Sequence, residues 1–354
     1  MAQDFRKKVE INFAHQSFKW KNLAKGNAGV TCVIIGLSNP TKDIKKLYFD
    51  NQYIGCKNIN PYLADGNNLI INSRTRLLSE RLPKIITGNR ALDGGNLMFS
   101  TEEKNKIVER HPQAKKFFKR VLGADEFINN VVRWCLWINQ EELEEIVNID
   151  EFQKRISLVK KYREDRRKKE LNDPADYAYR FLSTDRAKEN LIFVPQLSSE
   201  KREYIPIGYL GNEWIVIDPH FVIYDPEPYI FAVLNSKMHM TWVRAVGGRL
   251  KTDLRYSSAL CYNTFPFLEI TSKQKESLTS HVYNILEERE KYPEKTMADL
   301  YDPNKMPDGL REAHKYLDLA IDQIYRSKPF EGDEDRLAHL FKLYEEMITR
   351  EANK

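Results

Sequence analysis

The sequence predicts a mixed α+β protein with several small sheets and a helical C-terminal part. Short apolar runs that suit strands occur near the N-terminus and again at residues 191–266. Residues 101–171 and 271–350 instead carry the apolar spacing of amphipathic helices. With 354 residues the chain exceeds one average domain, so we expect about two or three domains.

Two strands are expected near the N-terminus, at residues 9–14 and 30–37. The second reads VTCVIIGL, a continuous apolar run typical of a sheet that is buried on both faces. The segment between them, SFKWKNLAKGNAG, has the composition of a polar loop that holds Phe18 and Trp20. At residues 47–96, clusters of Asn, Gly, Asp and Pro indicate turns between short extended segments.

Residues 101–171 have the pattern of three helices. Ser100 is a candidate N-cap, because Glu103 stands three positions later in a capping-box arrangement. The last helix is expected at about residues 149–170, and nine Lys or Arg residues lie between positions 154 and 169. Such a run fits either a solvated helix face or a helix that contacts phosphate groups.

Residues 191–266 return to strand patterns, with a helix-like stretch inserted among them. The strand patterns are LIFVPQL, YIPIGYL, EWIVID and HFVIYD, and the helix-like stretch is YIFAVLNSKMHMTWVRAVGG. The tail at 271–350 predicts three amphipathic helices, interrupted by YPEKTMADLYDPNKMPDG. We therefore expect a second mixed lobe followed by a helical domain.

Composition and charge exclude several classes of protein. No apolar run reaches the length of about 18 residues that a membrane span needs, and the N-terminus MAQDFRKKVE is too polar for a signal peptide. We therefore expect a cytoplasmic protein with no membrane partner. The net charge of +5 slightly favours an anionic partner. The four cysteines show no metal-ligand spacing and are expected to be buried free thiols; they are Cys32, Cys56, Cys135 and Cys261.

Separated segments along nearly the whole chain resemble, in one order, a known enzyme family. The segments are EINFAHQSFKWKNLAKGNAGVTCVIIGL, NINPYL, GNRALDGGNLMFSTEE, EFINNVVRWCLWI, VPQLSSEKREYIPIGYL, SKMHMTWVRAVGGRLKTDLRYSSALCYNTFPF and ADLYDPNKMPDGLREAH. Together they resemble the part of MmeI-like DNA adenine-N6 methyltransferases, which belong to restriction-modification systems, that follows the Asn-Pro-Pro-Tyr loop. The resemblance implies a chain that binds double-stranded DNA.

The resemblance also implies a division of the chain into three parts. Residues 1–45 look like the C-terminal strands of a methyltransferase domain, residues 46–268 like a mixed α/β target recognition domain, and residues 269–354 like a C-terminal helical domain. In the intact enzyme, a catalytic domain in cis or in trans uses S-adenosylmethionine to methylate the adenine that this chain presents. Members of that family can also carry an endonuclease at the far N-terminus.

The motifs that catalysis needs are missing from the sequence. It contains neither the Gly-rich cofactor loop nor an Asn-Pro-Pro-aromatic loop, and SNPT at residues 38–41 reads as a plain turn. It also shows no Walker loop, metal-ligand cluster or nuclease motif. We expect the chain alone to bind no cofactor and to be inactive.

The most informative stretch for DNA reading is GGRLKTDLRYS at residues 247–257. If it is extended, Lys251, Asp253 and Arg255 share one face, while Thr252 and Leu254 share the other. Lys and Arg suit the acceptors of guanine, and Asp accepts from the cytosine amine. The resemblance implies that Lys251 and Asp253 read the base beside the methylated adenine, a guanine, and that Arg255 reads another base. The alternative is a surface strand with a local ion pair.

Contacts to the DNA backbone should accompany base reading, since phosphate contacts set the register. The candidates carry a hydroxyl group or a positive charge; they are Ser198, Ser199, Lys201, Arg202, Arg244, Arg249, Lys168 and Lys169. Gly247 and Gly248 permit close approach to DNA, although a tight turn needs glycine equally. Phe18 or Trp20 is the candidate for stacking on the flipped adenine, and the alternative is an aromatic that packs the sheet edge.

Several conspicuous residues have a structural interpretation. His239 and His314 are expected to be hydrogen-bonded structural histidines, and Trp134, Trp137 and Trp242 to lie in the core. Two other functions stay open for the whole chain. One is a non-catalytic protein-interaction subunit that docks through its helical tail, and the other is a stand-alone nuclease or methyltransferase with unrecognised motifs.

Overall fold

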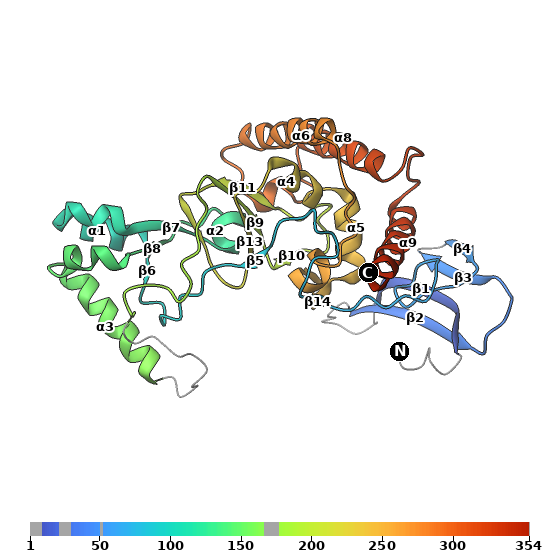
Figure 1. Ribbon diagram of the computed structural model, residues 1–354, viewed down its shortest axis with the longest axis horizontal. Coiled ribbons are helices and arrows are strands. Elements are labelled where there is room, and N and C mark those ends of the chain that lie inside the picture. Colours follow the sequence, from blue (N-terminus) through green and yellow to red (C-terminus); the bar gives the residue numbers. More distant parts are fainter. Residues whose placement is uncertain (1–8, 21–29, 50–51, 166–176, 354) are drawn as a thin grey trace. The chain divides into compact units, whose positions relative to one another are not determined.

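The computed structural model describes residues 9–20, 30–49, 52–165 and 177–353 (Figure 1). Their order of strands and helices confirms the mixed α+β class expected from the sequence. The chain divides into two compact units, and each unit is assembled from segments that are distant in sequence. Unit 1 comprises Met1–Leu82, Ser236–Leu278 and Lys315–Lys354, and unit 2 comprises Pro83–Asn235 and Thr279–His314. The three contiguous parts expected from the sequence stay a prediction, because these units are defined by compactness alone.

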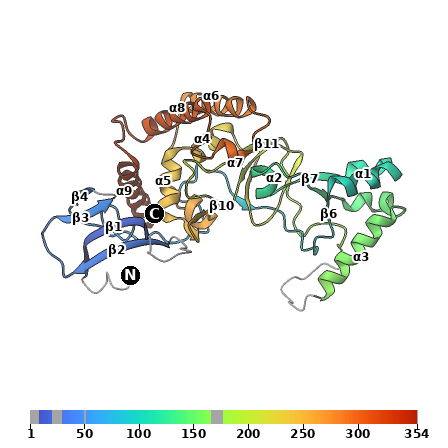
Figure 2. The ribbon, with the colours of Figure 1, turned by 180° about the vertical axis from the view of Figure 1, so that it is seen from behind.

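Unit 1 begins with a four-stranded sheet whose order is β2-β1-β3-β4. Its strands are β1 (Glu10–Trp20), β2 (Val30–Ser38), β3 (Lys45–Phe49) and β4 (Gln52–Cys56). They lie side by side in both views (Figures 1 and 2). β1 is antiparallel to β2 and parallel to β3.

The first strand is longer than the sequence predicts. The expected loop residues Phe18 and Trp20 belong to β1, where they pair with Cys32 and Val30 of β2. The register shifts between His15 and Phe18, so the pairing continues past an irregularity. The expectation that this segment is a loop is therefore wrong at its start, because pairing with the apolar β2 outweighs its polar composition.

The rest of unit 1 is organised around the helices α5 (Lys237–Val246) and α9 (Asp333–Ala352). Trp242 of α5 is fully buried and lies 5.8 Å from the ring of Phe341 and 5.7 Å from that of Tyr344, both on α9. The two helices run next to each other in both views (Figures 1 and 2). Trp242 is thus a core residue, as predicted.

Unit 2 contains two four-stranded sheets, with the orders β11-β9-β13-β5 and β12-β7-β8-β6. The strands are β5 (Ile86–Thr87), β6 (Met98–Phe99), β7 (Phe118–Leu122), β8 (Trp134–Leu136), β9 (Asn190–Val194), β11 (Gly208–Gly211), β12 (Trp214–Val216) and β13 (Phe221–Tyr224). The short strand β10 (Leu197–Ser198) follows β9. The helices are α1 (Thr101–Arg110), α2 (Ala124–Ile128), α3 (Asp150–Asp165), α4 (Pro228–Leu234) and α7 (Met297–Leu300), with the short helices η2 (Pro112–Phe117) and η3 (Gln140–Ile146).

The expectation of three helices at residues 101–171 is met by α1, α2 and α3, but α2 has only 5 residues and the strands on either side of it were not predicted. α1 and α3 are helices, but the residues between them include β7 and β8, which pair with each other in antiparallel register. Long-range pairing has overridden the local helical pattern there. The capping box at the start of α1 is confirmed, since Ser100 Oγ accepts from Glu103 N at 3.1 Å and a Glu103 carboxylate oxygen accepts from Ser100 N at 2.8 Å.

The helical C-terminal part agrees with the sequence pattern. Its long helices are α6 (Ser272–Glu290), α8 (Asp308–Tyr325) and α9, and the short α7 occupies the expected interruption. The helix-like stretch before residue 247 is divided into α4 and α5. Ser236 begins α5 by accepting a hydrogen bond from His239 N at 3.2 Å.

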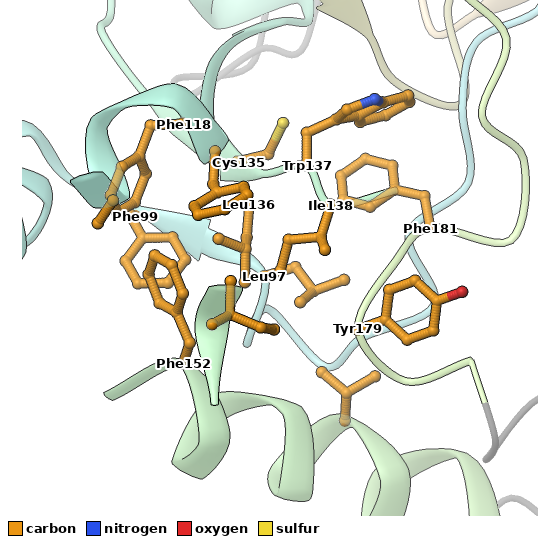
Figure 3. Packing of buried hydrophobic residues seen from close by; sticks show 14 of the residues in the cluster. Leu97, Phe99, Phe118, Cys135, Leu136, Trp137, Ile138, Phe152, Tyr179 and Phe181 are labelled. Carbon is orange, nitrogen blue, oxygen red and sulfur yellow. The ribbon is translucent and has the colours of Figure 1, made fainter. Parts of the chain in front are cut away.

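A large aromatic cluster fixes α3 in unit 2 (Figure 3). Phe152 of α3 is fully buried, and its ring centroid lies 5.6 Å from that of Phe118 and 6.4 Å from that of Phe99. Trp137 is buried against Phe181 at 5.6 Å, as predicted for a core residue. α3 is therefore held by its apolar face.

Trp134 differs from that expectation. Its side chain is only partly buried, its Nε1 donates to Thr101 Oγ1 at 3.1 Å, and the ammonium group of Lys104 lies 3.6 Å from the ring centroid. The prediction that Trp134 is a core residue is therefore wrong, because this ring sits at the rim of the cluster under a cation.

The packing of α3 is open to a direct stability test. Phe152→Ala removes a buried ring and leaves a cavity, so the free energy of unfolding should fall by about 3–5 kcal/mol. The control is Leu158→Ala on the same helix, whose side chain is 43% exposed and whose loss should cost at most about 0.5 kcal/mol. Urea unfolding followed by circular dichroism measures both, and equal losses would contradict the described packing.

Candidate nucleic-acid interface

The stretch expected to read bases forms a hairpin in unit 1. Its strands are β14 (Gly248–Leu250) and β15 (Asp253–Arg255), with Leu250 opposite Asp253 and Gly248 opposite Arg255. Lys251 lies in the connecting turn with φ of +57°, in the left-handed region. The expectation of one extended segment through Lys251 is therefore wrong, since the chain reverses at this residue.

The expected alternation holds along β15. Leu254 is only 1% exposed, whereas Asp253 and Arg255 are exposed on the opposite face. Lys251 is exposed at the turn. Within the part of the chain that the structure describes, these three charged side chains form no ion pair with one another, and both base reading and a plain surface strand stay open as interpretations.

The hairpin is tied to α5 at its base. The buried hydroxyl group of Tyr256 lies 3.0 Å from Nε2 of His239, which belongs to α5. Burial lowers the pKa of His239 to about 3, so the ring is neutral at physiological pH. His239 is thus the hydrogen-bonded structural histidine that the sequence predicts.

Gly247 is required where α5 meets the hairpin. Its amide donates to the carbonyl oxygen of Val243 at 2.8 Å, and a Cβ atom at this position would lie 2.5 Å from the same oxygen. Gly248 has no comparable crowding, since a Cβ there would meet its nearest neighbour at 3.8 Å. The close approach of residue 247 to the Val243 carbonyl group of α5 is therefore enough to explain why this residue is glycine.

Two arginines proposed to contact phosphate groups flank these glycines. Arg244 is exposed in the last turn of α5. Arg249 is exposed on β14, and its Nη1 donates to the carbonyl oxygen of Thr252 at 3.4 Å. Both cations reach solvent in the same unit as the hairpin.

The candidates after β10, in unit 2, form a tight turn. Ser199 O accepts from the amide of Arg202 at 3.2 Å, and Ser199 Oγ accepts from the amide of Lys201 at 3.4 Å. Lys201 is exposed, while Ser199 and Arg202 are partly buried. Ser198 is only 4% exposed, so its proposed phosphate contact is wrong for this conformation.

The basic residues of α3 lie in two different environments. Lys154, Lys160 and Lys161 are exposed, but Arg163 is buried and faces the interior of unit 2. The guanidinium group of Arg163 donates to backbone carbonyl oxygens at 2.8–3.0 Å; these belong to Ala91, Leu92, Tyr177 and Arg180. Arg163 therefore holds loops together, which the charge run did not reveal.

Several predicted contacts cannot be placed. Lys168 and Lys169 lie outside the described residues, and so does the side chain of Trp20. Phe18 is partly buried in β1, with its ring in edge contact with His15 at 5.0 Å. Stacking on a flipped base stays a prediction for Phe18 and Trp20.

Three family models match successive parts of the chain. They are described as the DNA-methyltransferase domain of MmeI, the target recognition domain of MmeI and the C-terminal domain of MmeI, and they match residues 2–49, 65–269 and 270–350. This chain belongs to the MmeI family. The hairpin that displays Lys251, Asp253 and Arg255 lies inside the segment matched by the target recognition domain.

Two relatives extend this assignment. The chain is 44% identical over 347 residues to DNA methyltransferase A of Bacillus subtilis (strain 168), covering 98% of this chain and 39% of that protein. It is 38% identical to the solved structure of the type IIL restriction-modification enzyme MmeI in complex with DNA, with a TM-score of 0.85, covering 98% of this chain and 47% of that one. The chain thus spans less than half the length of either relative.

The SNPT turn of this MmeI-family chain does not have the form of a methyl-donor site. SNPT at residues 38–41 is a largely exposed turn, in which the amide of Thr41 donates to the Glu10 carboxylate at 2.7 Å. Nucleoside recognition needs an enclosed loop with convergent donors, which this turn lacks. Among the described residues, no group of His, Cys, Asp and Glu is arranged to hold a metal ion. No described helix is both long and apolar enough to span a membrane.

The cysteines largely follow the expectation of buried free thiols. Cys56, Cys135 and Cys261 are buried, and burial raises the pKa of Cys135 and of Cys261 to about 12. Cys32 is only partly buried, so the prediction of burial is wrong for that residue. His314 is structural as predicted, because its Nε2 lies 2.8 Å from the hydroxyl group of Tyr301.

The neutral His239 at the base of the hairpin predicts a pH dependence of stability. The unfolded chain takes up a proton near the ordinary pKa of 6.5, whereas the folded chain resists protonation down to about pH 3. Stability should therefore fall as pH drops from about 6.5 towards 3, by up to about 1.4 kcal/mol per pH unit from this group.

His239→Gln removes this titration and should flatten the slope of unfolding free energy against pH in that window. His339→Gln on α9 is the control, since burial also lowers the pKa of this histidine, whose ring is only partly buried. Urea unfolding at several pH values measures the slope, and a slope unchanged in His239→Gln would show that the ring does not carry the effect.

Proposed function

We propose that this chain is the DNA-reading part of an adenine-N6 methyltransferase of a restriction-modification system. It binds a short asymmetric double-stranded site and presents the target adenine to a catalytic domain, in cis or in trans, in the cytoplasm. The observation that carries the proposal is the exposed hairpin with three charged side chains inside the segment matched by a target recognition domain. The DNA-bound state of the MmeI structure supports it.

The hairpin suits base reading for physical reasons. The major groove of DNA admits a two-stranded β-ribbon, and side chains near its turn can reach the base edges. Lys251 and Arg255 offer donors to the O6 and N7 acceptors of guanine, and Asp253 accepts from the cytosine amine. Lys251 and Asp253 together suit a G·C pair beside the adenine.

Phosphate contacts complete the proposed interface. Ser199, Lys201 and Arg202 form one candidate group, and Arg244 and Arg249 form another. Lys168 and Lys169, which lie outside the described residues, follow α3 in the sequence and are further candidates. Such contacts position the protein on the duplex and make the affinity depend on salt, because each neutralised phosphate group releases counterions.

The chain's own part in methylation is to bind and orient DNA. S-adenosylmethionine supplies the methyl group when it is bound in the catalytic domain, and Phe18 or Trp20 is proposed to stack on the flipped adenine. Unstacking a base costs a few kcal/mol, and an aromatic surface offsets part of that cost. The chain alone is expected to be inactive.

Selection of the purified chain on a randomised duplex library, at two salt concentrations, tests the proposal. Enrichment of one asymmetric motif that contains adenine is the expected result. Salt-sensitive binding without enrichment would show that specificity needs the catalytic domain. The absence of binding at both salt concentrations would overturn the proposal and favour a protein-interaction subunit.

A charge swap tests the base-reading pair. Lys251→Glu combined with Asp253→Arg should change the preference at one base pair, at about 1–3 kcal/mol of discrimination, and largely keep the overall affinity. Thr252→Ala in the same turn is the control and should keep the wild-type motif. Library selection compares the three proteins. A uniform loss of affinity across all sequences would mean that Lys251 and Asp253 contact only phosphate groups.

A single lysine tests the phosphate contacts. Lys201→Ala should weaken binding to every duplex alike and reduce the salt slope of the binding constant by about 1, because one counterion fewer is released. Lys342→Ala on the exposed side of α9 is the matched control with the same loss of charge. Fluorescence anisotropy at several salt concentrations gives the slopes, and equal slopes for both variants would exclude Lys201 from the interface.

A further inference from the structure

The turn at residues 199–202 continues directly into a largely buried segment, residues 203–207. Tyr204 is 2% exposed and Ile207 is fully buried, whereas Lys201 in the turn is exposed. Both stretches belong to unit 2. Because the chain is continuous, the contacts that fix the buried segment also limit where the side chain of Lys201 can lie.

Two side chains of α8 hold the start of this buried segment. The guanidinium group of Arg311 forms an ion pair with Glu203 and donates a hydrogen bond to the carbonyl oxygen of Pro303 at 3.0 Å. Three residues later, the buried ring of His314 stacks on that of Tyr204, with centroids 4.1 Å apart and planes inclined by 22°. An ion pair and a ring stack thus fix two adjacent residues immediately after the turn.

A chain of hydrogen bonds holds the other end of the segment. Arg289 of α6 donates from Nη1 to the carbonyl oxygen of Ile207 at 2.9 Å and from Nε to the hydroxyl oxygen of Tyr301 at 2.9 Å. Because a guanidinium group only donates, the Tyr301 hydroxyl group accepts from it and can donate its own proton to His314 Nε2, 2.8 Å away. The contacts at Tyr204 and Ile207 therefore belong to one network.

We propose that Arg311 is a positioning residue for DNA binding, which acts through Glu203 on the turn that carries Lys201. The inference rests on the proposed function and extends it to the segment matched by the C-terminal domain model, residues 270–350. The Arg311 side chain is only 23% exposed and is engaged by Glu203 and Pro303. Partly exposed ion pairs add little to global stability, but a local contact is enough to hold a turn in one geometry.

The salt dependence of DNA binding tests this role. Arg311→Met should reduce the salt slope of the binding constant by about 1, as Lys201→Ala does, because the released turn no longer presents Lys201 to a phosphate group. Combining the two changes should reduce the slope by about 1, whereas two independent contacts would reduce it by about 2. Fluorescence anisotropy of the full chain on one labelled duplex, at several salt concentrations, measures the slopes.

Arg326→Met is the matched control in unit 1. Arg326 pairs with Asp335, and the two side chains are 24% and 32% exposed, against 23% and 32% for Arg311 and Glu203. The control loses the same charge and an equivalent ion pair, so it should leave the salt slope unchanged. Equal reductions by Arg311→Met and Arg326→Met, or an additive reduction with Lys201→Ala, would overturn the proposal.

Glu203→Ala separates positioning from long-range attraction. This change removes a negative charge, so attraction to DNA alone would raise the affinity, whereas release of the turn lowers it. We expect a loss of about threefold or more, and no loss for the counterpart Asp335→Ala. A gain in affinity for Glu203→Ala would contradict a positioning role.

Limited digestion with trypsin examines the turn without DNA. Cleavage after Lys201 requires the turn to open locally, so its rate reports the open population. Arg311→Met should raise this rate about fivefold or more, and Arg326→Met should not. Arg311→Lys keeps the charge opposite Glu203 and should restore both the cleavage rate and the salt slope towards wild type. Circular dichroism of every variant checks folding, and Arg311→Lys and Glu203→Ala carry the test if Arg311→Met does not fold.

The two measurements distinguish failure of this inference from failure of the proposed function. A wild-type chain that binds no duplex would sink the proposed function, while faster cleavage in Arg311→Met would still show that Arg311 holds the turn. Faster cleavage with an unchanged salt slope would overturn the role of Arg311 in DNA binding alone. An unchanged cleavage rate would overturn the inference whatever the DNA measurements show.

Discussion

The display of charges on the β14–β15 hairpin depends on the burial of two neighbours, Leu254 and Tyr256. Each is 1% exposed, and burial of a large side chain stabilises by about 1.5–3 kcal/mol. Tyr256 adds a hydrogen bond to His239 of α5, which burial keeps neutral. Because alternate residues of a strand face opposite sides, burying Leu254 forces Asp253 and Arg255 into solvent.

A second constraint acts on α3 in unit 2. Phe152 anchors this helix in an aromatic cluster, and Arg163 ties it to four backbone carbonyl groups. With these two side chains turned inwards, Lys154 and Lys161 lie on the opposite side of the helix and face solvent. The same run of positive charge therefore combines a structural arginine with a cationic surface suited to phosphate groups.

β2 combines an apolar sequence with exposed side chains. A strand with Val33, Ile34 and Leu37 in solvent carries an unfavourable hydration cost unless another surface covers it. The family model of the methyltransferase domain matches residues 2–49, which include this strand.

The sequence by itself determined the mixed class, the capping box at Ser100, the C-terminal helices and the family, because these depend on local patterns and ordered motifs. Only the tertiary structure decided the turn at Lys251 and the pairing of β7 with β8. The turn residues Lys251 and Thr252 are not one of the residue pairs that predict a hairpin turn. The sequence therefore did not indicate that Leu250 lies opposite Asp253. The inward turn of Arg163 had no sequence signal, because its partners are backbone atoms distant along the chain, and only long-range packing brings them together.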